Sequence, residues 1–194
     1  SPADVAGRVV AVIDVLRAST TIATALVHGA RCIIPFESAE EVVLRSKQFE
    51  RRDVKLAGER RMRAIPGFDL GNSPAEFTRE AVEGRTILFS TTNGTPALLA
   101  TAGARDVVVA SYVNFRASLA FLRAAARGGA DVAIVCAGRD RHFALEDAAC
   151  AGRFVRGLLS RRRAEVALND AAHACILLDR RFGDRLDLLF AEAA

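Results

Sequence analysis

Short runs of β-branched and other apolar residues alternate with amphipathic stretches along most of this 194-residue chain. Such alternation is typical of α/β proteins, in which strands and helices follow one another along the chain. Strands are predicted over residues 9–14, 31–36, 53–57, 86–90, 106–111 and 131–136. Helices are predicted over residues 20–28, 38–51, 114–128 and 145–159. One further helix is predicted to begin at Ser73, and another to follow residues 91–96 and end near Thr101. After residue 163 the pattern weakens.

The chain also repeats itself. The matching stretches are residues 29–31 with 103–105, 53–60 with 131–139, and 68–70 with 143–145. We interpret them as two related halves, about residues 1–80 and 81–194, within a single compact domain over residues 1–194; chance likeness between strand–turn phrases is the alternative. In related halves, polar loops after equivalent strands could converge. We therefore expect a three-layer α/β sandwich whose two related α/β halves share one cleft.

Composition narrows the class of protein. No apolar run approaches the roughly 20 residues of a membrane span, and the N-terminus has no signal-peptide pattern, so a cytoplasmic protein is expected. The four cysteines form no CxxC pair, and three lie in apolar segments, which indicates buried thiols in a reducing compartment. The net charge of +4 accompanies no nucleic-acid-binding motif, so attraction of a small anion is the favoured interpretation.

Polar residues follow two of the predicted strands. Asp14 ends the first strand and is followed by Arg17, whose guanidinium could hold a phosphate or carboxylate. Thr91-Thr92-Asn93-Gly94-Thr95 follows another strand and could present hydroxyls and amides to an anion. The alternatives are an Asp14 that caps a helix and pairs with Arg17, and an ordinary capped turn at residues 91–95.

Two further loops carry candidate chemistry. Residues 67–74 crowd two glycines, a carboxylate, an amide and a helix cap into one turn. Glu146 and Asp147 begin a predicted helix, and paired carboxylates suit a hard cation such as Mg²⁺. Their alternative role is interaction with the helix dipole. Among the histidines, only His142 lies in a polar loop between candidate motifs.

Two well-known phosphatase chemistries fit poorly. A cysteine phosphatase requires Cys, five residues and Arg around an anion loop. Cys150 and Arg156 have this spacing, but they lie inside a predicted helix whose amides are already bonded. The haloacid-dehalogenase class requires Asp-x-Asp at a strand end, whereas Asp14 is followed by Val15 and Leu16. That class survives only as a distant analogue.

Taken together, the motifs resemble one family, the 2-phosphosulfolactate phosphatases. The matching stretches are residues 12–21 (VIDVLRASTT), 56–60 (LAGER), 65–74 (IPGFDLGNSP), 89–95 (FSTTNGT), 135–138 (VCAG) and 145–147 (LED). They occur in order and span roughly residues 9–152, which makes them more specific than any single motif. At Arg61-Met62-Arg63 the chain departs from a more glycine-rich family pattern.

The resemblance implies a magnesium-dependent phosphatase that removes phosphate from 2-phospho-3-sulfolactate, on the route to sulfolactate and coenzyme M. Its partner would be this phosphorylated sulfonic acid; neither nucleic acid nor a membrane is expected, and a homo-oligomer is compatible with the sequence. The expected catalytic residues are Asp14, Arg17, Glu59 and Asp69. The expected substrate-binding residues are Arg60, Asn72, Thr91, Thr92, Asn93 and, through the internal repeat, Arg139. The expected Mg²⁺ ligands are Asp14, Glu146 and Asp147.

Several alternatives stay open on the sequence alone. Another small phospho-acid could be the substrate, or the same loops could form a non-catalytic anion-binding module. The nucleophile could be water, or Asp14 could form a phosphoenzyme.

Overall fold

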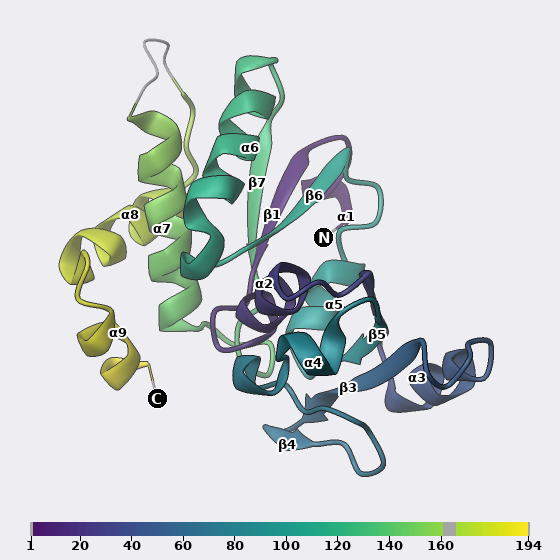
Figure 1. Ribbon diagram of the computed structural model, residues 1–194. Coiled ribbons are helices and arrows are strands. Elements are labelled where there is room, and N and C mark those ends of the chain that lie inside the picture. The colour runs from purple at the N-terminus through teal and green to yellow at the C-terminus, as the bar shows by residue number, and fades with distance from the viewer. Residues whose placement is uncertain (1, 161–165, 194) are drawn as a thin grey trace.

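The computed structural model describes residues 2–160 and 166–193 (Figure 1). Its strands are β1 (Val9–Ile13), β2 (Cys32–Pro35), β3 (Val54–Arg60), β4 (Arg63–Ala64), β5 (Thr86–Ser90), β6 (Asp106–Ala110) and β7 (Val132–Cys136). Its α-helices are α1 (Pro2–Val5), α2 (Ala18–Val27), α3 (Ala39–Ser46), α4 (Arg79–Val82), α5 (Gly94–Leu99), α6 (Phe115–Arg127), α7 (Leu145–Leu159), α8 (Asp170–Phe182) and α9 (Leu186–Glu192). Two 3₁₀ turns, η1 (Pro74–Glu76) and η2 (Tyr112–Asn114), complete the elements. None of the described helices is long and apolar enough to span a bilayer.

The strands form two sheets. One is parallel, with order β6-β1-β7, and the other is mixed, with order β2-β5-β3-β4. In both sheets the central strand is flanked by two parallel neighbours in the same register. Val9 lies opposite Asp106 and Val132, and Thr86 lies opposite Cys32 and Val54. The carboxyl ends of β1 and β5 are therefore the centres of two similar sheet edges, where parallel sheets bind ligands.

The sheets interleave the two ends of the chain. The first strand, β1, lies between two late strands, β6 and β7, whereas the later β5 lies between the early strands β2 and β3. The division into halves near residue 80 stays a prediction. If the chain is divided there, each half places its first strand, β1 or β5, in the sheet formed by the other half. Neither half would then hold a complete sheet, so both must fold together to place either central strand.

Helices cover both faces of each sheet, which gives the layered α/β sandwich expected from the sequence. On the β1 sheet, α6 and α7 cover one face through Leu122 and Phe154, while α5 contributes to the apolar cluster on the other. On the β5 sheet, α2 packs through Ile22 against one face and α3 packs through Val42 against the other. Helix α2 follows β1 in the chain but packs on the β5 sheet, and α5 follows β5 but packs on the β1 sheet. Both helices therefore lie between the two sheets (Figure 1).

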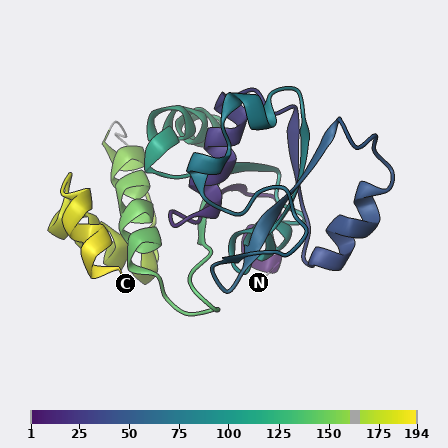
Figure 2. The same cartoon turned by 60° about the horizontal axis from the view of Figure 1, so that its bottom comes forward.

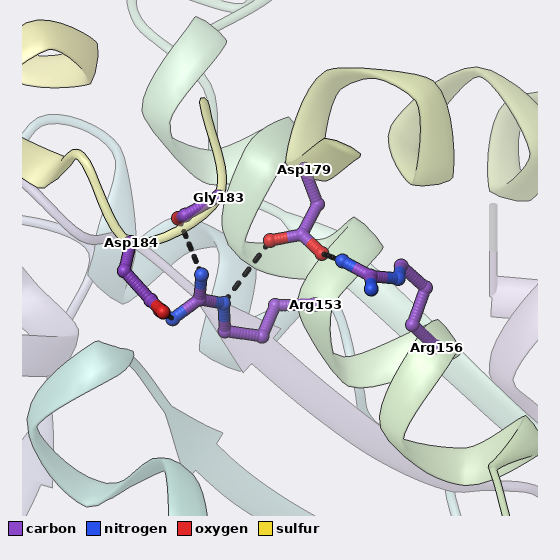
Figure 3. A network of polar contacts seen from close by, with 5 residues as sticks. All are labelled: Arg153, Arg156, Asp179, Gly183 and Asp184. Atoms are coloured by element: carbon purple, nitrogen blue, oxygen red, sulfur yellow. Dashed lines mark hydrogen bonds and ion pairs between the residues drawn. The ribbon is translucent and has the colours of Figure 1, made fainter. Parts of the chain in front are cut away.

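The C-terminal helices α8 and α9 pack on α7, at the opposite end of the molecule from α3 (Figure 2). The buried carboxylate of Asp179 on α8 bridges Arg153 and Arg156 of α7 (Figure 3). Arg153 also donates to the carbonyl of Gly183 and pairs with Asp184 at 2.9 Å. This network fixes the end of α8 against α7 because both oxygens of a buried carboxylate are paired.

Most predicted elements are found, and the differences have local causes. The predicted helix over 38–51 ends at Ser46, because i→i+3 turns follow and bring Phe49 beside Val42 in the core. The helix predicted from Ser73 is only the turn η1, followed separately by α4. The strand predicted over 53–57 is longer than expected, since β3 continues to Arg60 and turns into β4. Helices α8 and α9 lie where the sequence pattern had weakened.

Candidate active site

The carboxyl ends of β1 and β5 meet across the two sheets. Asp14 directly follows β1, and Gly94 begins α5 just beyond β5. A Cβ atom placed on Gly94 would lie 2.6 Å from Asp14 Oδ2 and 2.4 Å from the Cβ of Ala18. This approach is possible only without a side chain at residue 94. The loop after β5 therefore borders the Asp14 carboxylate directly.

The Asp14 side chain is buried and held by its own loop. Its Oδ1 accepts a hydrogen bond from the Ala18 amide at 3.1 Å, at the start of α2. Burial raises the pKa of Asp14 to about 6; the Ala18 hydrogen bond opposes this rise, and the nearby carboxylates of Glu59 and Glu146 add to it. Asp14 is thus a carboxylate whose charge the fold makes costly.

Glu146 and Asp147 reach the same region from the first turn of α7. Asp147 accepts hydrogen bonds from the amides of Val15 at 2.8 Å and Gly138 at 3.0 Å. Burial raises the pKa of Asp147 to about 7; the charges of Asp14 and Glu146 contribute to this rise, and the two hydrogen bonds oppose it. The Glu146 side chain is 5% exposed, and its carboxylate accepts no hydrogen bond from any described residue.

Glu59 comes from the other sheet, near the end of β3. Its Oε1 accepts from the Thr92 amide at 2.7 Å, and its Oε2 accepts from the Met62 amide at 2.8 Å and the Thr92 hydroxyl at 3.0 Å. Beside it, the Asp140 amide donates to Asn93 Oδ1 at 2.9 Å. The tight turns after β3 and β7 therefore both contact the loop that follows β5.

The site is a cluster of four buried carboxylates without basic partners. Asp14, Glu59, Glu146 and Asp147 are each at most 7% exposed. Within residues 2–160 and 166–193, no Lys, Arg or His forms an ion pair with any of them. Backbone amides stabilise three of the four, but a group of buried carboxylates without a positive partner still favours a cationic ligand.

Comparison with known proteins gives the site its context. The family model for 2-phosphosulpholactate phosphatase matches residues 1–194. The chain belongs to this family. It is 46% identical over 187 residues to a probable 2-phosphosulfolactate phosphatase of Symbiobacterium thermophilum, covering 96% of this chain and 78% of the relative. A relative of the same name from Caldanaerobacter subterraneus is 43% identical over 78% of this chain and 61% of its own length. The 2-phosphosulpholactate phosphatases are phosphoric monoester hydrolases.

Three candidate anion-binding groups of this family member have unused donors. No described residue accepts from or pairs with the guanidinium of the half-buried Arg17, next to the Asp14 loop. The Asn93 Oδ1 holds Asp140, which leaves the Asn93 amide nitrogen to donate elsewhere. Arg139 opens the tight turn after β7 and is exposed, with its main chain bonded to His142.

Other predicted site residues lie in contacts that already use their polar groups. Arg60 donates to the carbonyls of Glu59 and Glu37 and to the Ser90 hydroxyl. The Thr91 hydroxyl and the Thr95 amide bond to each other at 2.9 Å. The Thr92 hydroxyl both donates to Glu59 and accepts from the Arg61 amide at 3.1 Å.

Asp69 lies apart from the carboxylate cluster in its contacts. It pairs with Arg51 and, at 3.7 Å, with Lys55, and it accepts from the Leu56 amide at 2.8 Å. Partial burial works to raise the pKa of Asp69, but the Arg51 and Leu56 hydrogen bonds outweigh it and hold the pKa below its ordinary value. Through these contacts Asp69 connects the loop after β4 to strand β3. We therefore leave Asp69 out of the proposed site.

Asn72 is buried with one polar atom unpaired. It is 5% exposed, and its Oδ1 has no hydrogen-bond partner among the described residues. Its carbonyl accepts from the Thr21 hydroxyl at 3.0 Å, which places residue 72 at the first turn of α2. A buried amide oxygen without a donor is uncommon in proteins, so Asn72 stands out among the predicted site residues.

Sequence analysis missed the backbone groups of the site. Val15, Met62 and Gly138 take part through their amides, so their side chains give no signal. Gly138 lies in the matching stretch 135–138, and the structure shows why glycine stands there: its φ is +70°, and a Cβ would lie 2.2 Å from the His142 carbonyl oxygen.

Proposed function

We propose that this chain hydrolyses the phosphate ester of 2-phospho-3-sulfolactate with the help of Mg²⁺. The relatives bear the name of this activity, but the match covers 78% and 61% of the length of the two compared above, so the substrate and the reaction of this chain are proposals. The observation that carries the proposal is the cluster of buried carboxylates, without basic partners among the described residues, where the two sheet edges meet.

A cation is needed for this site to accept the substrate. Phosphate, sulfonate and carboxylate groups make the substrate strongly anionic, and a carboxylate cluster would repel it. Mg²⁺ prefers oxygen ligands, usually keeps several waters, and commonly uses one or two carboxylates together with substrate phosphate. When bound, it would neutralise the phosphoryl oxygens.

Asp14 and Glu146 fit this cation best. No group of three or more His, Cys, Asp or Glu side chains in the described chain is arranged to hold a metal alone. Asp14 Oδ2 faces the Gly94 loop, and the Glu146 carboxylate has no described hydrogen-bond donor. Two carboxylates with the substrate phosphate would satisfy the magnesium preference without a third side chain.

The remaining groups would bind and orient the anion. We assign this role to Arg17, to the amide of Asn93 and to Arg139, since each has donors that no described residue uses. The unpaired Asn72 oxygen would accept a hydrogen bond, so it suits a bound water or a hydroxyl group rather than an anionic oxygen. We also place the reaction in the cytoplasm and on the coenzyme M route; four free thiols support the reducing compartment.

Chelation tests the metal part of the proposal. Phosphate release from 2-phospho-3-sulfolactate should stop after treatment with EDTA and return on addition of Mg²⁺. Full activity after rigorous chelation would contradict the need for a metal. Absence of phosphate release with Mg²⁺ present would instead support a non-catalytic anion-binding module.

A further inference from the structure

Two of the four buried carboxylates use both of their oxygens on backbone amides. Asp147 Oδ1 and Oδ2 accept from Val15 and Gly138, at 2.8 and 3.0 Å. Glu59 Oε1 and Oε2 accept from Thr92 and Met62, at 2.7 and 2.8 Å. Hydrogen bonds between amides and an ionised carboxylate are among the stronger ones in proteins. These two side chains therefore already have partners in the protein itself.

The two carboxylates do the same structural task in the two sheets. Val15 lies two residues beyond the central strand β1, and Thr92 lies two residues beyond the central strand β5. The second amide comes each time from the chain just beyond a neighbouring strand, β7 for Gly138 and β3 for Met62. Each carboxylate thus ties the end of a central strand to the end of its neighbour.

The tied amides adjoin the residues that face the site. Val15 directly follows Asp14, and Thr92 directly precedes Asn93. We propose that Glu59 and Asp147 are positioning residues that fix the Asp14 and Asn93 loops, and that they contact neither the cation nor the substrate. The inference rests on the proposed function and divides the four carboxylates into two pairs. Asp14 and Glu146 bind the cation, while Glu59 and Asp147 hold the loops.

The competing assignment makes Asp147 a metal ligand. A carboxylate has about four lone-pair sites, so Asp147 could accept two amides and still bind a cation. The neighbouring Glu146 offers a matched comparison, because it is also buried, at 5% exposed against 2% for Asp147, but accepts no hydrogen bond from the described residues. Asp147→Asn and Glu146→Gln each replace one carboxylate oxygen by an amide nitrogen, which cannot accept a hydrogen bond or bind a cation.

The test combines amide hydrogen exchange with Mn²⁺ binding followed by electron paramagnetic resonance. In Asp147→Asn, exchange at Val15 or Gly138 should rise about tenfold or more, because one hydrogen bond is lost. Its Mn²⁺ affinity should stay within about threefold of wild type, whereas Glu146→Gln should lose about thirtyfold or more with unchanged exchange. Mn²⁺ binding lost equally in both variants would overturn the proposal, as would unchanged exchange in Asp147→Asn.

Kinetics and a second variant separate positioning from general loosening. Asp147→Asn should lower kcat about tenfold with KM within about twofold and little change in melting temperature, since the substrate-binding groups remain. If Asp147→Asn does not fold, Glu59→Gln tests the same claim through exchange at Thr92 or Met62; unchanged exchange there would overturn it. A wild-type protein that releases no phosphate would refute the proposed function, while the exchange results would still decide the positioning role.

Discussion

The carboxyl ends of strands β1 and β5 have the same hydrogen-bonding pattern but different chemistry. Asp14 follows β1 and bonds the Ala18 amide four residues on, at 3.1 Å. Thr91 follows β5 and bonds the Thr95 amide four residues on, at 2.9 Å. One cap is a buried carboxylate with a raised pKa, and the other is a neutral hydroxyl. The comparison teaches that a repeated framework can hold the reactive charge at one strand end and keep the other neutral.

The sharpest way to break this comparison is to change both caps conservatively. Asp14→Asn keeps an oxygen for the Ala18 amide but removes the charge, so kcat should fall about a thousandfold, or ~4 kcal/mol. Thr91→Ser keeps the hydroxyl, and its kcat should stay within about threefold of wild type. Steady-state phosphate release measures both. Equal losses in the two variants would show that the two strand ends do not differ in chemical importance.

The contact between the two strand ends gives the next largest effect. A Cβ on Gly94 would lie 2.6 Å from Asp14 Oδ2, so Gly94→Ala must displace the carboxylate or the start of α5. We expect kcat/KM to fall about a hundredfold, since small misplacements of reacting groups are costly. Gly128→Ala, at the end of α6, serves as the control. A Cβ atom on Gly128 would come no closer than 3.3 Å to its nearest neighbour, the Ala125 carbonyl oxygen. Normal kinetics in Gly94→Ala would mean that Asp14 need not lie where it does.

Two arginines extend the comparison to the positive charges. Arg17→Ala removes a guanidinium that has no described partner, so kcat/KM should fall at least about tenfold, or ~1.4 kcal/mol, with little change in melting temperature. Arg60→Ala removes hydrogen bonds to Glu37, Glu59 and Ser90, so it should lower the melting temperature more than the kinetics. Kinetic parameters and thermal unfolding of both variants check this. A kinetic loss in Arg60→Ala together with a loss of thermal stability in Arg17→Ala would contradict this assignment of binding and structural roles.

The last prediction concerns stability and its dependence on pH, not catalysis. The pKa of Asp14 is near 6 when folded and near 3.8 when unfolded, so the folded state retains its proton more strongly. The metal-free wild type should therefore lose stability relative to Asp14→Asn as the pH rises from 4 to 7, by up to about 3 kcal/mol. Thr91→Ser should show no such divergence. Urea denaturation at several pH values measures it, and parallel curves for wild type and Asp14→Asn would contradict it.

The sequence predicted the fold well where local signals were strong. The strand Thr86–Ser90 and the helix beginning at Leu145 lie where apolar runs and polar flanks placed them. The pairing of β1 with β6 and β7 was not predictable, because strand partners depend on long-range packing rather than on local pattern. The C-terminal helices were missed, since their weaker pattern becomes stable only through contacts such as Asp179 with Arg153.

The candidate site was predicted as a set of residues but not as a set of contacts. Asp14, Glu59, Glu146 and Asp147 do cluster. The sequence could not distinguish a carboxylate bonded by amides, such as Asp147, from one without donors, such as Glu146, because the donors are backbone groups of distant segments. For the same reason Asp69, in a matching motif, could not be separated from the cluster.

The most direct test of the account is a substrate panel with the purified protein and Mg²⁺. The panel compares phosphosulfolactate, phospholactate, phosphoglycolate and phosphoglycerate at equal concentration, with the impaired variant Asp14→Asn as the control. The account predicts the highest kcat/KM for phosphosulfolactate and, for Asp14→Asn, phosphate release about a thousandfold slower than wild type. Equal rates on all four would remove the specific substrate, and undiminished release by Asp14→Asn would contradict the site itself.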